Sequence, residues 1–268
     1  MIRHQRAPHQ RGNGAASLEV AAQGLARLHQ AAPLRVLFPT PDPGQPLEAV
    51  LVNVAGGLAG GDALEARIAL REGAKALVTT PAAEKIYRSL GEDSRIGVRI
   101  EVAEGAVLEY LPQEAILFDS ARLRRRMDAQ VAPGGTLLAA ESVVLGRIAR
   151  GETWKSGALH DSWRLHQGGR LLWADALALD AARRDTPFGL DGADSLGMIL
   201  LLAEGAARHR DLARELTQGA ASLVRPGLLL LRFLGTAGGV RGAMATAIVE
   251  MRSAALGRPR SLPRLWTC

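Results

Sequence analysis

The chain has 268 residues, of which 47% are hydrophobic, 22% charged and only 4% aromatic. This balance is that of an ordinary globular protein, so it excludes a disordered chain and predicts a core built from Leu, Val, Ile and Ala. The net charge of +6 comes from 33 Lys and Arg against 27 Asp and Glu, and almost all of the cations are arginine. Such a surface suits an acidic protein partner, whereas nucleic acid is disfavoured because base stacking needs aromatic platforms.

The sequence also indicates a compartment. No apolar leader follows the N-terminal residues, and no stretch approaches the ~20 apolar residues that span a membrane. The single cysteine, Cys268, excludes an intramolecular disulfide and is typical of a reducing environment. We therefore expect a cytoplasmic protein that does not contact a membrane.

In most of the chain, apolar and polar residues alternate with the period of two that is typical of β-strands. Residues 1–15 show no hydrophobic periodicity and are expected to form a mobile tail. In the segment at 64–70 the even-numbered residues are apolar while Glu65 and Arg67 lie between them, which is the pattern of a half-buried strand. Strands are expected at 17–22, 33–39, 47–54, 64–70, 74–80, 95–102, 107–111, 123–131, 136–145, 158–166 and 171–179.

The last third of the chain has a different pattern. Residues 198–205 fit either a strand or a buried helix, because periodicity cannot separate the two in a short apolar run. A helix is expected at 208–218, a strand at 228–235 and a longer helix at 240–256. Prolines after that helix leave 258–268 as an extended, basic, partner-binding tail. Because no helical pattern separates the earlier strands, residues 16–257 are expected to form one mainly β domain, a sandwich, barrel or solenoid.

The glycine-rich segment GGLAGGD at 56–62 suggests a phosphate-binding loop, because glycines allow backbone amides to converge on an anion. It fits neither a P-loop nor a dinucleotide motif, since the negative charge of Asp62 would repel a phosphate. Two interpretations remain: a turn in which Asp62 bonds its own amides, or a closely approached backbone with Asp62 facing a cavity. The glycines concerned are Gly56, Gly57, Gly60 and Gly61.

Two further segments carry unusual combinations of residues. In TTPAAEKIYRS (79–89), Thr79 precedes Thr80, which is placed to cap a helical turn that begins at Pro81. The same segment offers a contact patch made of Lys85, Tyr87, Arg88 and Ser89. In LEYLPQEAILFDSA (108–121), three carboxylates stand among apolar neighbours, where a charge is costly unless it is paired, hydrated or bound to a cation.

Common enzyme and metal motifs are missing. The sequence contains no nucleophile elbow, no paired-histidine zinc motif and no CxxC, and its six histidines show no i,i+4 pair. His160 and His166 would share a strand face but lie too far apart for one metal. Any nickel or zinc would therefore be held weakly, by carboxylates, carbonyls and water.

In their order and spacing, the three segments at 56–62, 79–89 and 108–121 resemble the UreD (UreH) family of urease accessory proteins. PLRVLFP (33–39) and PRLW (263–266) resemble that family's early strand and C-terminal signature, although Pro81 stands where many relatives have Gln and 150–190 offers little to match. The resemblance implies a mainly β, helical-solenoid fold with a few helices in the C-terminal third, and no enzymatic activity.

The resemblance further implies a chaperone that docks on apo-urease and, with UreF and the GTPase UreG, delivers nickel through an internal passage. Heteromeric complexes of this kind are expected to pair as dimers, and no cofactor is expected to be tightly bound. We predict weak contacts with nickel in transit at Asp62, Glu65, Glu109, Glu114 and Glu141. Contacts with UreF are expected at Met244, Ile248, Met251, Arg264, Leu265 and Trp266.

Two other functions stay open at this stage. A polysaccharide-active enzyme on a β-solenoid would use paired carboxylates such as Glu109 and Glu114, although the low aromatic content disfavours a sugar cleft. A nucleic-acid-binding protein would use the arginines at 122 and 124–126, and steep salt dependence of binding would reveal it.

Overall fold

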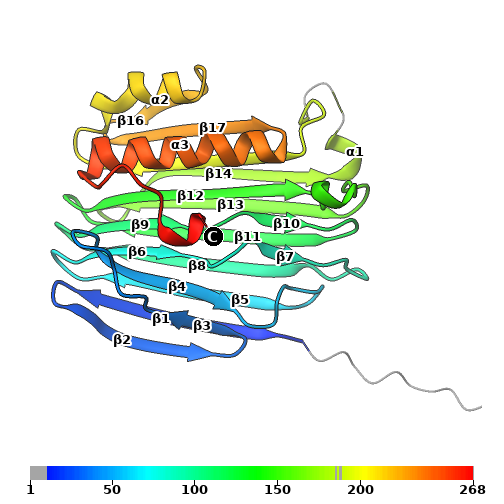
Figure 1. Ribbon diagram of the computed structural model, residues 1–268, viewed down its shortest axis with the longest axis horizontal. Coiled ribbons are helices and arrows are strands. Elements are labelled where there is room, and N and C mark those ends of the chain that lie inside the picture. Colours follow the sequence, from blue (N-terminus) through cyan, green and yellow to red (C-terminus); the bar gives the residue numbers. More distant parts are fainter. Residues whose placement is uncertain (1–10, 185, 187–188, 268) are drawn as a thin grey trace, which may run out of the picture.

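The computed structural model describes residues 11–184, 186 and 189–267. It shows two stacked sheets that the chain builds by crossing repeatedly from one to the other (Figure 1). From β4 to β13, the long strands alternate between the sheets, and neighbours within each sheet run parallel. The prediction of a single, mainly β, solenoid-like domain is therefore confirmed.

Sheet A has seven strands and one face open to solvent. Its inward residues are apolar and its outward residues polar, as in β5, so the sequence alternates as expected for a half-buried strand. Its strands in spatial order are β14 (Arg170–Asp180), β13 (Ala158–Gln167), β11 (Arg122–Val131), β8 (Ser94–Val102), β5 (Ala63–Leu70), β1 (Asn13–Ala21) and β2 (Gly24–Ala31).

Sheet B has ten strands and is covered on both faces along much of its length. Nine of the ten residues of β12 are buried, which explains why its sequence is almost continuously apolar. Its main strands in spatial order are β16 (Ala221–Arg225), β17 (Leu228–Gly235), β15 (Ser195–Leu202), β12 (Thr136–Leu145), β9 (Val107–Leu111), β6 (Lys75–Thr79), β4 (Leu47–Asn53) and β3 (Leu34–Leu37). The short strands β7 (Glu84–Ile86) and β10 (Ala115–Leu117) pair with each other, and β10 also pairs with β12.

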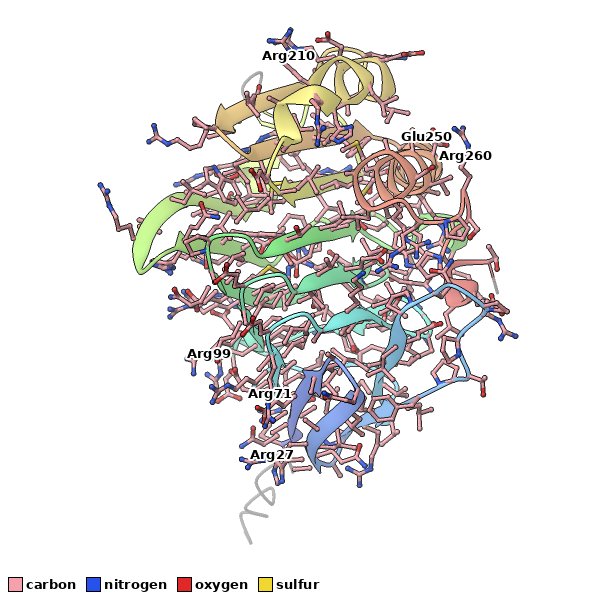
Figure 2. All side chains as sticks on the ribbon, turned by 90° about the vertical axis from the view of Figure 1, so that its left-hand side faces the viewer. Arg27, Arg71, Arg99, Arg210, Glu250 and Arg260 are labelled. Carbon is pink, nitrogen blue, oxygen red and sulfur yellow. The ribbon has the colours of Figure 1, made fainter. Side chains whose placement is uncertain are left out.

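The helices form a third layer on the outer face of sheet B. The long helix α3 (Ala237–Leu256) runs across that face beside α2 (Arg210–Leu216), and a second hydrophobic core lies beneath them. The remaining helical segments are η1 (Ile148–Arg150), α1 (Ala181–Arg184), η2 (Ala206–His209) and η3 (Arg264–Trp266). Figure 2 shows Arg27, Arg71 and Arg99 projecting from the opposite side of the molecule from Glu250 of α3 and Arg260.

Several boundaries differ from the sequence predictions. Residues 1–10 of the expected mobile tail lie outside the described residues, and β1 already begins at Asn13. Within the ambiguous run at 198–205, the residues up to Leu202 belong to strand β15, which pairs with both β12 and β17, and 203–205 form the turn that follows it. The tail at 258–267 does not extend away from the domain. It folds back on sheet B, where Trp266 is buried. The sequence analysis did not identify the strands β2, β7, β10 and β16.

Candidate functional site: a polar cluster between the two sheets

The glycine-rich segment and the segment at 79–89 pack directly against each other. Tyr87 donates a hydrogen bond to the carbonyl oxygen of Gly56 at 2.9 Å, and its ring covers Gly57. A Cβ on Gly57 would lie 2.5 Å from that ring, and a Cβ on Gly60 would lie 2.8 Å from the carbonyl oxygen of Glu92. Glycine is therefore required at 57 and 60 because the neighbouring segment leaves no room for a side chain.

The third sequence motif joins the other two. Arg88 forms a β-bridge with Ala121, and the Ser89 amide donates to the carbonyl oxygen of Ser120. The Tyr87 and Phe118 rings meet edge to face at 5.1 Å. The three segments that carry the family resemblance thus assemble in one place, although they lie far apart in the sequence.

Asp62 has a structural role in this assembly. One carboxylate oxygen accepts from the Ala59 amide at 2.7 Å and the other accepts from the Gly12 amide at 2.7 Å. The interpretation in which Asp62 bonds its own turn is therefore correct, and it does not face an interior cavity.

The predicted helical turn at Pro81 is wrong. Thr80 Oγ1 accepts from the Gln113 amide at 2.9 Å and donates to the carbonyl oxygen of Ala82, so its hydroxyl joins two segments and caps no helix. Thr79 is fully buried and donates to the carbonyl oxygen of Leu111. These bonds to the segment at 111–113 fix the end of β6, and a bend at 81–82 then leads into β7, which begins at Glu84.

Glu109 is fully buried on the helix side of sheet B. Its two oxygens accept from Nε of Arg252 at 2.5 Å and Nε of Arg258 at 2.8 Å. Arg252 also donates to the carbonyl oxygen of Ser261. Glu109 therefore anchors α3 and the tail and has no contact with solvent, so it cannot serve as a catalytic carboxylate.

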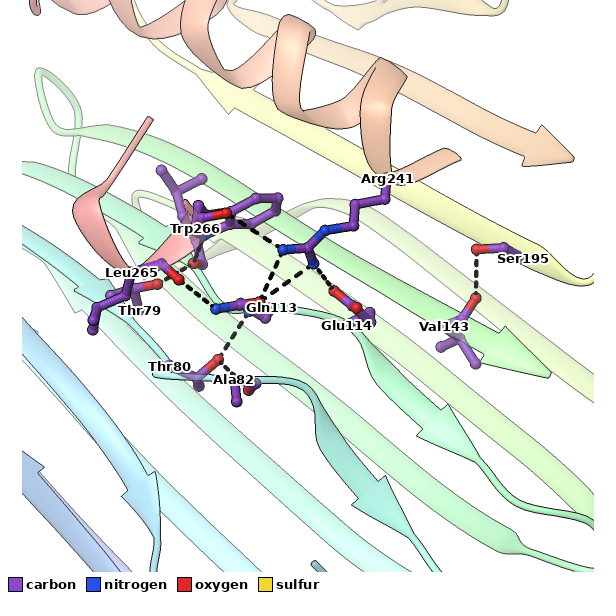
Figure 3. Close-up of polar contacts among 11 residues, drawn as sticks. Thr79, Thr80, Ala82, Gln113, Glu114, Val143, Ser195, Arg241, Leu265 and Trp266 are labelled. Carbon is purple, nitrogen blue, oxygen red and sulfur yellow. Dashed lines mark hydrogen bonds and ion pairs between the residues drawn. The ribbon is translucent and has the colours of Figure 1, made fainter. Parts of the chain in front are cut away.

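Glu114 lies on the outer face of sheet B, where Arg241 from the start of α3 reaches it at 2.5 Å (Figure 3). Arg241 also contacts the Gln113 side chain and lies over the Trp266 ring at 5.7 Å. The side-chain amide of Gln113 donates to the carbonyl oxygen of Leu265 at 2.7 Å. Glu114 thus belongs to the contacts that hold the tail against sheet B.

Only one of the five predicted nickel-contacting carboxylates lies between the sheets. Glu141 on β12 is buried there, whereas Glu65 is exposed on the outer face of sheet A. The structure therefore does not bring Asp62, Glu65, Glu109, Glu114 and Glu141 together, because they point toward a turn, two different outer faces and the interior.

Glu141 belongs to a buried polar cluster with Arg125 of β11 and Asp161 of β13. Arg125 Nε donates to Asp161 at 3.1 Å, Nη2 donates to the same carboxylate at 2.5 Å, and Nε lies 3.3 Å from Glu141 Oε2. All three residues are less than 9% exposed. One cation therefore faces two carboxylates in a low-dielectric interior, where an unpaired charge is expensive.

This environment shifts the protonation equilibria of the cluster. Burial raises the pKa of Glu141 to about 8, and Asp161 adds to the increase while Arg125 opposes it. Burial alone would lower the pKa of Arg125, but the two carboxylates more than offset that effect and raise it. Near neutral pH this raised pKa favours the protonated form of Glu141, which lies beside the Arg125–Asp161 ion pair.

Two cavities meet at this cluster. One of about 240 Å³ extends from Arg125 and Glu141 past Trp163 to Asp175 on β14, the edge strand of sheet A, and to Arg232 on β17 of sheet B. These last two residues form an exposed ion pair at 2.7 Å.

A second cavity of about 80 Å³ shares Arg125 and Glu141 and extends the other way, to Thr80, Gln113 and Glu84. Burial raises the pKa of Glu84 to about 7, although Asn53 donates a hydrogen bond to it at 2.9 Å. The two cavities together are lined by a series of carboxylates, from Glu84 through the buried Glu141 and Asp161 to the partly exposed Asp175.

Alternation within the strands could have revealed the residues that the sequence analysis missed. Arg125 stands in phase with the inward Leu123 and Met127 of β11, and Asp161 stands in phase with Leu159 and Trp163 of β13. Of the arginines considered for nucleic acid, Arg125 is thus the buried one.

The structure contains no ready-made metal centre in the part of the chain that it describes. No three His, Cys, Asp or Glu side chains among residues 11–184, 186 and 189–267 are grouped so that they could hold a metal ion. The polar cluster offers two carboxylates, and both face Arg125. A cation could be held there only weakly and in competition with the guanidinium group and a proton.

The apolar residues predicted to contact UreF are buried within this chain. Met244, Ile248 and Met251 of α3 are at most 1% exposed and pack on sheet B. Trp266 is 6% exposed, and its indole donates to the carbonyl oxygen of Leu111. These four side chains therefore hold the helix layer in place, whereas Arg264 is exposed.

A sequence profile described as UreD urease accessory protein matches residues 12–267. The chain belongs to the UreD family of urease accessory proteins. It is 46% identical over 238 residues to Urease accessory protein UreD of Granulibacter bethesdensis, which covers 86% of this chain and 99% of that protein. It is 42% identical over 279 residues to Urease accessory protein UreD 2 of Methylorubrum populi, and the match covers 96% of this chain and 91% of that protein. It is 40% identical over 255 residues to Urease accessory protein UreD of Magnetococcus marinus, and the match covers 90% of this chain and 88% of that protein.

Membership of the UreD family makes the chain a urease accessory protein and not an enzyme. The polysaccharide-active alternative is overturned, and the buried pairing of Glu109 agrees with this result. Within the described residues, no helix is long and apolar enough to cross a membrane.

Proposed function

We propose that this chain is a cytoplasmic scaffold for urease maturation that docks on apo-urease and, together with UreF and the GTPase UreG, passes nickel through its interior. The observation that supports this proposal most directly is the buried cluster of Arg125, Glu141 and Asp161, from which cavities extend in two directions. Nickel is cargo here and not a resident cofactor.

The protonation state of this interior suits transit more than storage. Glu84 and Glu141 have raised pKa values, so an incoming cation must displace a proton from each of them before it gains a charged ligand. Oxygen ligands bind nickel less tightly than imidazole or thiolate. A passage lined in this way would release a cation readily, because no position offers a complete set of charged ligands.

The partner surfaces proposed for UreF also change with the structure. The inward face of α3 is occupied by the chain itself, so a partner would meet the outward face, which exposes Gly242, Thr246 and Ala254. In the tail, Arg264 is exposed and lies 3.8 Å from Asp42. We propose that UreF contacts the domain through this outward face and the tail.

The nickel passage can be tested with Glu141→Gln and Glu84→Gln, which keep the side-chain volume and remove the ionisable group. Glu65→Gln is the matched control, because Glu65 lies outside the proposed passage on the open face of sheet A. Each variant would be co-expressed with urease and its accessory proteins, and urease activity and nickel per urease active site would be measured.

We expect both interior variants to lower nickel content and activity several-fold while the accessory complex still co-purifies with urease. The control should match the unaltered chain. Full activation by the Glu84→Gln, Glu141→Gln double variant would contradict transfer along this series of carboxylates.

A further inference from the structure

A second concave surface lies outside the interior passage. It is a groove of about 590 Å³ on the outer face of sheet B, between the β7–β10 pair and the start of α3. We call it the β10–α3 groove. Its apolar floor contains Ile116, Phe118, Val144 and Val240.

The rim of the β10–α3 groove is strongly basic. Lys85, Arg147, Arg150 and Arg241 line it, and Glu114 is the only carboxylate among its lining residues. Two of the arginines already have partners, since Arg241 pairs with Glu114 and Arg147 pairs with Glu152. In the described part of the chain, neither Lys85 nor Arg150 forms an ion pair, and both side chains are exposed.

The floor and walls of the groove are held in place by neighbouring contacts. The Arg147 guanidinium lies 4.5 Å from the centre of the Phe118 ring, whose other contact is the edge of Tyr87 at 5.1 Å. Arg241 is fixed by Glu114 and Gln113 (Figure 3). A ligand would therefore meet a largely preformed surface, which reduces the entropy cost of binding.

The start of α3 closes one end of the groove without adding to its charge. The exposed Gly238 of its first turn lies in the groove lining, but the preceding Ala237 amide already donates to a carboxylate oxygen of Asp194, which offsets the partial positive charge of the helix N-terminus. The positive charge of the groove therefore comes from the side chains of its rim.

We propose that the β10–α3 groove binds an extended segment of a partner protein in which acidic and apolar side chains alternate. Carboxylates of the segment would meet Lys85 and Arg150, while its apolar side chains would cover the partly exposed Ile116. A nucleic acid fits less well, because its phosphates would leave the apolar floor uncovered and the Phe118 ring is already occupied by Arg147. This inference adds a partner site to the proposed maturation role and rests on that role for its setting.

The direct test uses the full-length chain and fluorescein-labelled peptides in fluorescence anisotropy. The probes are an alternating Glu-Leu peptide, an alternating Lys-Leu peptide, an all-Glu peptide of equal length and a single-stranded oligonucleotide. We expect the Glu-Leu peptide to bind most tightly, because it alone satisfies both the rim and the floor.

A matched pair of double variants identifies the site. Lys85→Glu with Arg150→Glu should weaken binding of the Glu-Leu peptide on the order of tenfold or more, since two attractive charges become repulsive. Arg99→Glu with Arg225→Glu makes the same change in net charge at exposed positions elsewhere, and it should change binding less than twofold. All of these residues are exposed, so thermal unfolding of both variants should match that of the unaltered chain.

Three results would overturn the inference. If both double variants lost the same amount of affinity for the Glu-Leu peptide, the peptide would be attracted by the net charge of the protein and not by this groove. Equal binding of the Lys-Leu peptide would remove the role of the basic rim, and tighter binding of the oligonucleotide would assign the surface to nucleic acid. None of these results depends on urease activation, so the groove can fail while the maturation role stands.

A second measurement covers the case in which a short peptide binds too weakly to detect. A photo-crosslinking amino acid at the exposed Ala149 would be activated in cells that produce urease and its accessory proteins. We expect crosslinks to a partner segment rich in Asp or Glu and in apolar residues, identified by mass spectrometry. Crosslinks confined to segments without acidic residues would refute the proposal.

Discussion

Glu84 provides the most direct test of how the interior is solvated. Its carboxyl group lies at one end of the smaller cavity, where it accepts a hydrogen bond from Asn53 at 2.9 Å. Burial is the largest cause of its raised pKa, and the hydrogen bond from Asn53 opposes that increase. Folding therefore imposes a cost on the charged form of Glu84 that Glu84→Gln would remove.

The size and sign of this cost follow from proton linkage. The pKa of Glu84 rises from 4.5 to about 7 on folding, so between these values the folded state binds more protons than the unfolded state. Stability is then lost as the pH rises, by up to about 1.4 kcal/mol per pH unit, and the total approaches about 3 kcal/mol above pH 7. Below pH 4.5 both states are protonated and the cost disappears.

The assay is urea unfolding followed by tryptophan fluorescence at pH 5, 6, 7 and 8, for the unaltered chain and Glu84→Gln. Taking the difference in unfolding free energy between the two proteins at each pH cancels the contributions of groups that titrate equally in both. We expect the variant to gain about 2 to 3 kcal/mol relative to the unaltered chain between pH 5 and pH 8.

Glu72→Gln is the matched control, because the same change at an exposed side chain removes no buried charge. The difference in unfolding free energy between Glu72→Gln and the unaltered chain should vary by less than about 0.5 kcal/mol from pH 5 to pH 8. A flat profile for Glu84→Gln as well would refute the reasoning, since it would mean that water or a counter-charge already solvates the Glu84 carboxylate.

Two further substitutions test the helix layer through the same unfolding free energy, measured at pH 7. Glu109→Gln should destabilise the protein by about 3 to 5 kcal/mol, because it leaves Arg252 buried without its carboxylate; a loss below 1 kcal/mol would show that the tail does not depend on this pair. Gly242→Ala should stabilise it by about 0.5 to 1 kcal/mol, because the position is helical, exposed and free of any atom within 4 Å of a new Cβ; a loss of stability would instead reveal a contact on the outer face of α3.

The sequence motifs were informative about local structure, but they suggested the wrong location for the polar site. Asp62 and Glu109 were selected because they stand among glycines or apolar residues. The structure satisfies Asp62 through the neighbouring Ala59 and the distant Gly12, and Glu109 through the distant Arg252. The charge of a buried carboxylate is stabilised by whichever donor the fold brings near. Composition around the carboxylate therefore cannot distinguish an anchoring residue from a cavity-lining one.

Arg125 and Asp161 show the opposite case. Each is a charged residue at a position where the alternation of its strand places inward-facing, otherwise apolar side chains. The sequence therefore contained the signal that both are buried. Their pairing requires the parallel register in which Arg125 lies beside Asp161. Glu141 approaches them from the facing sheet, so this contact depends on the spacing of the two layers.

The apolar residues of α3 were predicted correctly as one face of a helix, but their partner was not. Met244, Ile248 and Met251 share that face because successive members are four and three residues apart, and helical residues at these spacings lie on the same side. Hydrophobicity shows that a face is covered without showing by what, and here sheet B covers it.

By itself, the sequence determined the mainly β character, the length of most strands, the long C-terminal helix and the family, because local periodicity and motif spacing are written along the chain. Only the tertiary structure decided which carboxylates meet which arginines, where the cavities run and which face of α3 remains exposed. Those features depend on contacts between residues such as Gln113 and Leu265, which are 152 positions apart in the chain. Their energies come from burial and pairing that exist only once the two sheets and the helix layer have packed together.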